Sequence, residues 1–266
     1  MQKVKELPEG LSAAIPSITG KYIYLEASNI WIFDVENKRI VRKIPNSHYS
    51  RISKSKFSTR WGYTTWKKNS VECVILEDEE GVKERYHFSL SSKNEADCEI
   101  IFSSIESSKC WIQTKHAIYS WDLNTNRVNS VFKTEGYVRS CIALGNTIAF
   151  LECFPIPHYG NLLISNTNND RILHYPIRDI YGHLDGNSII HAKWLISLSD
   201  DSFVLACEHG RPLCTDLFLV RISGEECNST FVTQYPYNLG KPDLSKNGKK
   251  VLCCSDYIDR EKNNYN

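Results

Sequence analysis

The chain has 266 residues, of which 41% are hydrophobic, 24% charged and 11% aromatic, and its formal net charge is +1. These values are typical of a globular protein with a sizeable core, and they exclude a wholly disordered chain. With so little net charge there is no global field to attract nucleic acid or an anionic membrane, so we expect neither as a partner.

Runs of β-branched and aromatic residues, separated by Gly, Asn, Asp and Ser, predict β-strands along the whole chain. The runs come in sets. The predicted strands, in chain order, span 11–19, 21–27, 29–35 and 39–44; then 60–68, 71–78 and 82–88; then 109–115, 117–123 and 127–133; then 146–154, 161–167 and 171–177; then 202–209, 215–222 and 227–234, with a last set opening at 241. No long window has a helical period, and 181–187 is predicted to be a loop.

The sets repeat about every 40–45 residues, as in a repeat architecture. One four-stranded meander cannot cover both of its faces, whereas stacked units bury them and radial closure protects their edges. The sequence therefore predicts an all-β fold, a single β-propeller domain over residues 1–266 with about six four-stranded blades. The predicted blades are 9–46, 47–91, 92–135, 136–178, 179–235 and 236–266, the last one latched by an N-terminal strand at 2–7. A sixth blade that lacks one strand, and a chain cut from a longer ring, both remain open.

The stretch 199–256 carries a blade motif: the strand Thr215–Val220, a turn at Ser223–Glu225, and a second turn reading Ser-Lys-Asn-Gly-Lys at 245–249. This stretch resembles the WD-repeat-like blades of the TolB family and of prolyl-oligopeptidase-type propellers. In those families a Ser-x-Asp-Gly-Lys turn joins the innermost strand to the second. A weaker copy lies at Ser197–Ser202, and the first four blades lack the motif. The resemblance implies a fold and not an activity.

Cysteine usage indicates the compartment. There are ten cysteines without Cys-x-x-Cys spacing, and most lie inside apolar strand runs, which favours buried free thiols in a reducing environment. Pro8 and Pro16 interrupt the N-terminal segment, so no signal peptide is expected, and no run reaches the roughly 18 apolar residues of a spanning helix. We expect a cytoplasmic, monomeric protein.

Two segments are candidate contact surfaces for a partner. The first is the proline-rich aromatic loop of 154–160, in which Phe154, Pro155, His158 and Tyr159 are the predicted contacts, because apolar loop residues on a rigid scaffold are typical of binding surfaces. The second is the basic, aromatic stretch 51–68 with Trp61 and Trp66. Strand alternation places at least one of these aromatic residues in the core. The other interpretation of the stretch is a solvated blade edge.

A metal site is the alternative. The residues His183, His191, His209 and Gln234 are similar to the histidine and glutamine set of oligogalacturonate lyases, which are propeller enzymes. That resemblance implies a manganese or zinc ion that acidifies a substrate proton, with Arg211 on the sugar carboxylate. No metal-binding spacing supports it, and the scattered histidines fit ordinary loop and strand positions equally. Cys207, His209 and Cys214 form a weaker zinc pattern without a fourth ligand.

The sequence contains no nucleophile elbow and no phosphate-binding glycine loop. The leading hypothesis is therefore a non-catalytic propeller scaffold, without a cofactor, that binds a protein or peptide on one face of the ring. A metal-dependent carbohydrate enzyme is the alternative. A propeller domain of a larger peptidase-like or sensor protein is the third.

Overall fold

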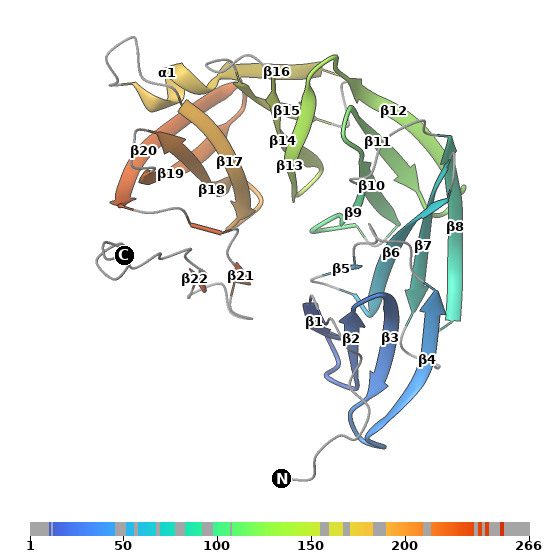
Figure 1. Ribbon diagram of the computed structural model, residues 1–266. Coiled ribbons are helices and arrows are strands. Elements are labelled where there is room, and N and C mark those ends of the chain that lie inside the picture. The colour runs from blue at the N-terminus through green and yellow to red at the C-terminus, as the bar shows by residue number, and fades with distance from the viewer. Residues whose placement is uncertain are drawn as a thin grey trace, which may run out of the picture. The chain divides into compact units, whose positions relative to one another are not determined.

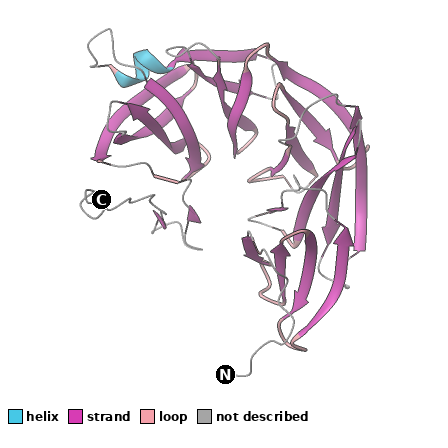
Figure 2. Cartoon of the chain, viewed as in Figure 1, coloured by secondary structure: helices cyan, strands magenta, loops and turns pink. Residues whose placement is uncertain are grey.

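The structure, a computed structural model, is all-β apart from one short helix (Figures 1 and 2). The residues that it describes are 11, 13–45, 52–55, 58–67, 70–77, 83–91, 98–106, 108–154, 160–166, 171–182, 190–209, 214–236, 239–240, 243–244 and 251–252. The chain divides into two compact units, Met1–Lys133 and Thr134–Asn266. The expectation of a single domain stays a prediction.

Three four-stranded antiparallel sheets make up the first unit. The first sheet contains β1 (Ala13–Pro16), β2 (Tyr22–Glu26), β3 (Asn29–Asp34) and β4 (Arg39–Pro45). The second contains β5 (Ile52–Lys54), β6 (Arg60–Lys67), β7 (Ser70–Glu77) and β8 (Lys83–Ser91). The third contains β9 (Glu99–Phe102), β10 (Lys109–Gln113), β11 (Ala117–Asp122) and β12 (Arg127–Lys133). In every sheet, strands that are consecutive in sequence are neighbours in space.

The second unit repeats this meander twice. Its first sheet contains β13 (Tyr137–Leu144), β14 (Thr147–Cys153), β15 (Gly160–Asn166) and β16 (Arg171–Pro176). Its second contains β17 (Ile190–Ser197), β18 (Ser202–His209), β19 (Cys214–Ser223) and β20 (Glu226–Tyr235). A short antiparallel pair follows, β21 (Asp243–Leu244) with β22 (Val251–Leu252).

The predicted all-β propeller is confirmed, with five four-stranded sheets that each fall inside a predicted blade range. The strands β21 and β22 lie inside the predicted sixth blade, and the proposed latch at residues 2–7 lies outside the described residues. The predicted and observed blades agree because strand runs and turn residues recur at a regular spacing along the chain.

The helix α1 (Ile177–Tyr181) was not predicted. Five residues are too few to show a helical period in the sequence. Pro176 precedes it, and Gly182 ends it in the left-handed conformation at φ 67°, donating its N–H to the carbonyl of Arg178. Within the described residues no helix is long and apolar enough to cross a membrane.

A β-bulge recurs between the third and fourth strands of four sheets. At each bulge, one residue of the fourth strand has no partner in the register: Val41, Arg85, Val131 and Val232. The bulge increases the local twist of the edge strand, as expected where neighbouring sheets of a propeller splay apart. A bulge at the same place in four sheets indicates that these blades share one strand arrangement.

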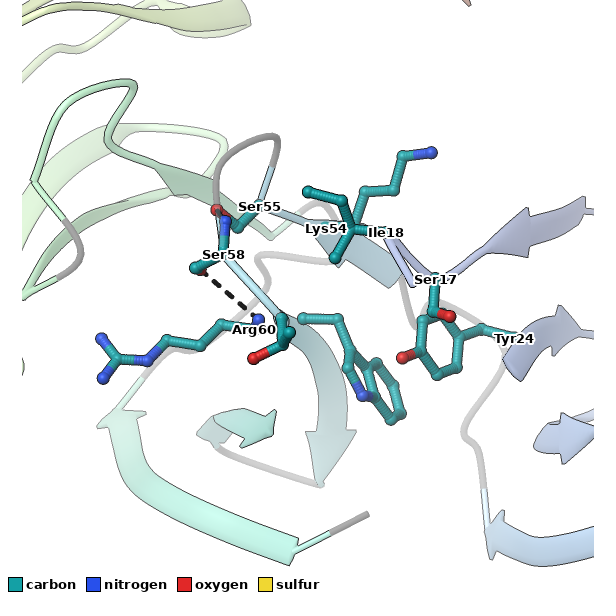
Figure 3. Close-up of a pocket in the computed structure, with 9 residues that line it drawn as sticks. Ser17, Ile18, Tyr24, Lys54, Ser55, Ser58 and Arg60 are labelled. Atoms are coloured by element: carbon teal, nitrogen blue, oxygen red, sulfur yellow. Dashed lines mark hydrogen bonds between the residues drawn. The ribbon is translucent and has the colours of Figure 1, made fainter. Parts of the chain in front are cut away.

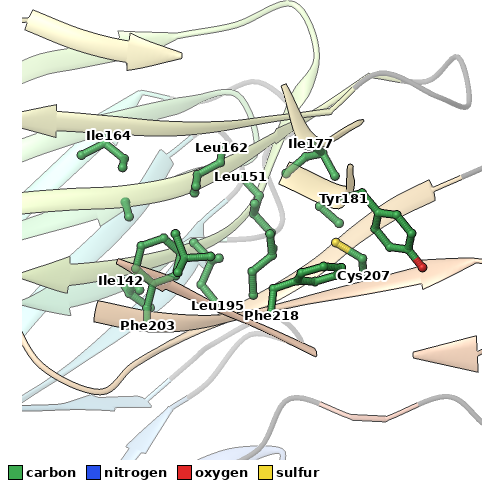
Figure 4. Packing of buried hydrophobic residues seen from close by; sticks show 14 of the residues in the cluster. Ile142, Leu151, Leu162, Ile164, Ile177, Tyr181, Leu195, Phe203, Cys207 and Phe218 are labelled. Carbon is green, nitrogen blue, oxygen red and sulfur yellow. The ribbon is translucent and has the colours of Figure 1, made fainter. Parts of the chain in front are cut away.

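The core lies between neighbouring sheets of each unit. In the first unit the Trp61 ring stacks on Tyr24 from the adjacent sheet, with ring centroids 3.9 Å apart. In the second, Leu151 and Leu162 of one sheet pack against Phe203 and Phe218 of the next (Figure 4). Eight described cysteines are free thiols and six of them are buried, as predicted. Inter-sheet packing is therefore the main source of stability.

Candidate functional site

In the first unit, every loop that joins a first strand to a second strand begins at a buried serine. The backbone N–H of Ser17 donates to the carbonyl of Tyr22 at 2.8 Å, and that of Ser55 to Arg60 at 2.9 Å. The N–H of Ser103 donates to Lys109 at 3.2 Å. Each bond joins the end of the first strand to the start of the second, so the loop between them is closed at its base.

The serine hydroxyls hold the same loops from inside. The Oγ of Ser17 accepts the N–H of Tyr22, that of Ser55 the N–H of Ser58, and that of Ser103 the N–H of Glu106, each at 3.1 Å. Hydroxyl-to-backbone bonds of this kind are typical of serine turns. The loops are therefore pre-organised.

The first four blades lack the complete Ser-x-Asp-Gly-Lys motif, as the sequence indicated, and the serine turns are a further feature that was not predicted. The glycine of the familiar motif is missing, but a serine is present in three of those blades, at 17, 55 and 103. The signal that could have found these turns is a serine directly after a first strand and five or six residues before a second strand.

An exposed apolar side chain follows two of these serines. Ile18 is 38% exposed and Ile105 is 56% exposed. In the second unit Leu198 follows Ser197 at the corresponding loop and is 41% exposed. Large aliphatic side chains on rigid loops lose little entropy on binding, and apolar loop surface is typical of interaction sites.

Beside Ile18 the surface of the first unit has a shallow depression that is open to solvent (Figure 3). Lys54 and Arg60 lie on its rim, and the Nε of Arg60 is held 2.8 Å from the Oε1 of Glu77. The depression encloses almost no space that a bound molecule could occupy. It is therefore a shallow feature of the surface, far below the roughly 300–1,000 Å³ that is usual for small-molecule sites.

The predicted contact residues are placed as follows. Trp61 is 1% exposed and belongs to the core between two sheets, so the prediction that it contacts a partner is corrected to a packing role. The backbone of Trp66 lies in β6. Phe154 follows β14 and is half-buried, beside Gly136. Pro155, His158 and Tyr159 lie outside the described residues, as does the side chain of Trp66.

The predicted metal ligands are brought together only in part. His209 Nε2 and Gln234 Nε2 lie 3.1 Å apart. His191 pairs with Glu208, whereas His209 pairs with Ile190 and Cys214, so the two histidines project from opposite faces of the sheet. Among the described residues no three His, Cys, Asp or Glu side chains gather at metal distance, and His183 and Arg211 lie outside them.

The weaker zinc pattern is not assembled in the structure, because among the described residues Cys207, His209 and Cys214 do not gather at metal distance. Cys207 is fully buried, and burial raises the pKa of its thiol far above the ordinary value. Cys207 is accordingly a core residue of the second unit.

Around His209 the structure forms a polar cluster that the sequence did not predict. The Nε2 of His209 lies 3.1 Å from the Oδ2 of Asp216, and the Tyr181 hydroxyl donates to the same oxygen. Asp216 is 3% exposed, and its Oδ1 has no hydrogen-bond partner among the residues that the structure describes. The sequence showed Asp216 only as part of a strand, and Tyr181 reaches it from the short helix α1.

Replacing Asp216 by asparagine is expected to stabilise the protein at neutral pH. Burial raises the pKa of this carboxyl above its ordinary value of 3.8. A carboxyl with a raised pKa in the folded state contributes stability below pH 3.8 that is lost as pH rises through the folded-state pKa. Asparagine keeps an acceptor for Tyr181 and carries no charge. Urea midpoints measured between pH 4 and 7 should fall with pH in the wild type relative to the variant; parallel curves would contradict this.

Three comparisons with known proteins complete the description. No family model matches the chain, and no curated protein matches it. Among solved structures, a chain of the mitotic checkpoint complex is similar with a TM-score of 0.65 at 13% identity, covering 95% of this chain and 76% of that one. A prolyl endopeptidase gives 0.62 at 8% identity, covering 92% of this chain and 38% of that one. TolB from Acinetobacter baumannii gives 0.51 at 14% identity, covering 87% of this chain and 56% of that one.

These similarities show the fold alone, because every identity is low. They agree with the resemblance read from residues 199–256, and this chain spans about half of TolB and less than half of the prolyl endopeptidase. The chain has the fold of the β-propellers, of the kind found in WD-repeat proteins, TolB and prolyl endopeptidases.

Proposed function

We propose that this chain is a non-catalytic propeller scaffold that binds a protein or peptide partner on one face. The observation that carries the proposal is the pair of exposed side chains Ile18 and Ile105, presented by loops that buried serines hold at their base. Both loops join a first strand to a second strand, so they leave their sheets at corresponding ends. A partner with apolar side chains fits this surface, because association buries apolar area without ordering the loops.

The loop after Phe154 is the second candidate contact and lies at the other end of its sheet. It joins the second strand of its blade to the third, whereas the loops of Ile18 and Ile105 join first to second. Antiparallel strands alternate in direction, so these two kinds of loop leave a sheet at opposite ends. Variants at Ile105 and Phe154 therefore test loops at opposite ends of their own blades.

The test is affinity capture followed by a binding titration with the purified partner. We expect Ile105→Asp, and more strongly Ile18→Asp with Ile105→Asp, to weaken the partner's affinity at least tenfold, as apolar contacts at an interface centre do. Val41→Asp is the matched control, because Val41 is 40% exposed but lies on a fourth strand. Circular dichroism verifies that each variant is folded. A partner bound equally by all of these variants but lost with Phe154→Ala would move the site to the Phe154 end of that blade. Turnover of a substrate by the purified chain would remove the proposal.

A further inference from the structure

Two cysteines of the first unit meet where its second and third sheets pack together. Cys73 lies in β7, and Cys98 directly precedes β9. Their Sγ atoms are 4.0 Å apart, although the two residues are 25 positions apart in the chain. Both side chains are buried, at 0% and 3% exposure. The fold therefore brings two thiols from different sheets into contact inside the core.

A buried hydrogen bond holds Cys98 in this place. The Thr64 hydroxyl donates to the carbonyl of Cys98 at 2.8 Å. Thr64 lies in β6 directly opposite Cys73, so both side chains project from the same face of the second sheet. Thr64 is 1% exposed, so water does not compete for its hydroxyl. One residue of the second sheet thus fixes the backbone of Cys98 beside the thiol of Cys73.

The two sheets approach closely at the neighbouring positions as well. A Cβ added at Gly62 would lie 2.8 Å from the Cδ1 of Ile100, nearer than real Cβ atoms come. Gly62 lies two residues before Thr64, and Ile100 lies two residues after Cys98. The contact between the sheets therefore repeats with the period of the strands. The cysteine contact belongs to a continuous packed interface.

The sulfur atoms need only a short movement to form a bond. A disulfide bond is about 2.05 Å long, so from a separation of 4.0 Å each sulfur has to move by about 1 Å. Rotation of the two side chains with a small shift of the strands supplies this movement. The geometry therefore permits a covalent link between the second and third sheets.

We propose that Cys73 and Cys98 form a disulfide bond when the protein meets hydrogen peroxide. First, the thiolate of one cysteine attacks a peroxide oxygen, the O–O bond breaks, and a sulfenic acid forms while hydroxide leaves and takes up a proton. Then the thiolate of the other cysteine attacks that sulfur, the S–O bond breaks, and a second hydroxide leaves and becomes water. Two thiols lose two electrons and two protons, and one peroxide becomes two water molecules.

Burial determines how fast this reaction runs and which oxidant can start it. The thiolate is the nucleophile, and apolar surroundings disfavour it. Cys110 of the same cluster shows this effect, because burial raises the pKa of its thiol well above the ordinary value. We therefore expect the pair to react more slowly than a partly exposed thiol. Peroxide is small enough to enter a core that opens briefly, whereas a bulky disulfide is not.

The new bond is expected to stabilise the first unit. It joins two sheets and closes a loop between residues that are 25 positions apart, which restricts the unfolded chain. The equilibrium constant for unfolding should fall by at least about tenfold on oxidation. The proposal is independent of the proposed partner-binding function, because it concerns buried side chains and not the exposed loops of Ile18 and Ile105.

Peroxide treatment of the folded chain tests the proposal. The remaining thiols are blocked with N-ethylmaleimide in denaturant, and the protein is digested without reductant and analysed by mass spectrometry. We expect peptides of Cys73 and Cys98 that are joined by a disulfide, are lighter by two hydrogen atoms and separate on addition of dithiothreitol. Cys214, which is partly exposed, reports whether the oxidant has acted.

Two variants separate the pair from its surroundings. Cys98→Ala removes one sulfur of the pair. Cys110→Ala is the matched control, because Cys110 is buried in the same cluster but both sulfurs of the pair remain. Circular dichroism verifies that both are folded. Peroxide should raise the urea midpoint of the wild type and of Cys110→Ala, and should not raise that of Cys98→Ala.

Three outcomes overturn the proposal. The first is the absence of linked peptides at a peroxide dose that has oxidised Cys214. The second is a link from Cys73 to Cys110 in place of Cys98. The third is a link that forms only in urea, because the unfolded chain and not the contact in the core would then bring the thiols together.

Discussion

Replacing Trp61 by alanine is expected to lower the free energy of unfolding by about 3–5 kcal/mol, the cost of removing a large aromatic side chain from a core. Trp61 is 1% exposed and its ring stacks on Tyr24 of the neighbouring sheet at 3.9 Å. The change therefore opens a cavity between two sheets that stabilise each other chiefly by packing. Urea denaturation followed by circular dichroism measures the loss.

Trp61→Phe is the matched control. The indole Nε1 has no hydrogen-bond partner among the described residues, so phenylalanine removes volume but no hydrogen bond. It keeps a ring for Tyr24 to stack on and should cost less than half of the alanine loss. If Trp61→Ala unfolds at the wild-type urea midpoint, that result would contradict the packing of Trp61 between the first two sheets.

Replacing Glu208 by glutamine is expected to destabilise the protein by about 3 kcal/mol, as when one partner of a buried ion pair is removed. The Nζ of Lys193 lies 2.6 Å from the Oε1 of Glu208, and the two side chains are only 12% and 10% exposed. Glutamine leaves the ammonium group without its carboxylate in a poorly hydrated place. The loss should appear as a lower urea midpoint with an unchanged slope.

The double variant Lys193→Met with Glu208→Gln shows whether the unpaired charge is the cause. Removing the ammonium as well should restore at least half of the lost stability, because burying an apolar chain costs less than burying an unpaired charge. Equal destabilisation by the single and the double variant would show that the loss comes from packing. The pair would then contribute little as a charge pair.

The candidate site shows the limit of sequence reasoning. The serine turns at Ser17, Ser55 and Ser103 were not predicted, because these loops lack the glycine that completes the familiar motif. Of the predicted metal ligands, His209 and Gln234 lie side by side, whereas His191 projects from the other face of the sheet. Its face depends on strand register, and a shift of one residue reverses the face of every side chain.

The sequence by itself determined the architecture. The alternation of apolar runs and turn residues, repeated five times, requires sheets that can cover their faces only by stacking on one another. The spacing of apolar runs and the chemistry of turns are local, so they can be read from neighbouring residues.

Only the tertiary structure decided which aromatic residues are buried and which are exposed. Trp61 looked like a surface contact in a basic stretch, and its burial depends on Tyr24 in another sheet. Asp216 and Tyr181 are 35 residues apart in the chain and meet because α1 lies against the last four-stranded sheet. Burial depends on contacts between distant segments, which a local pattern does not encode.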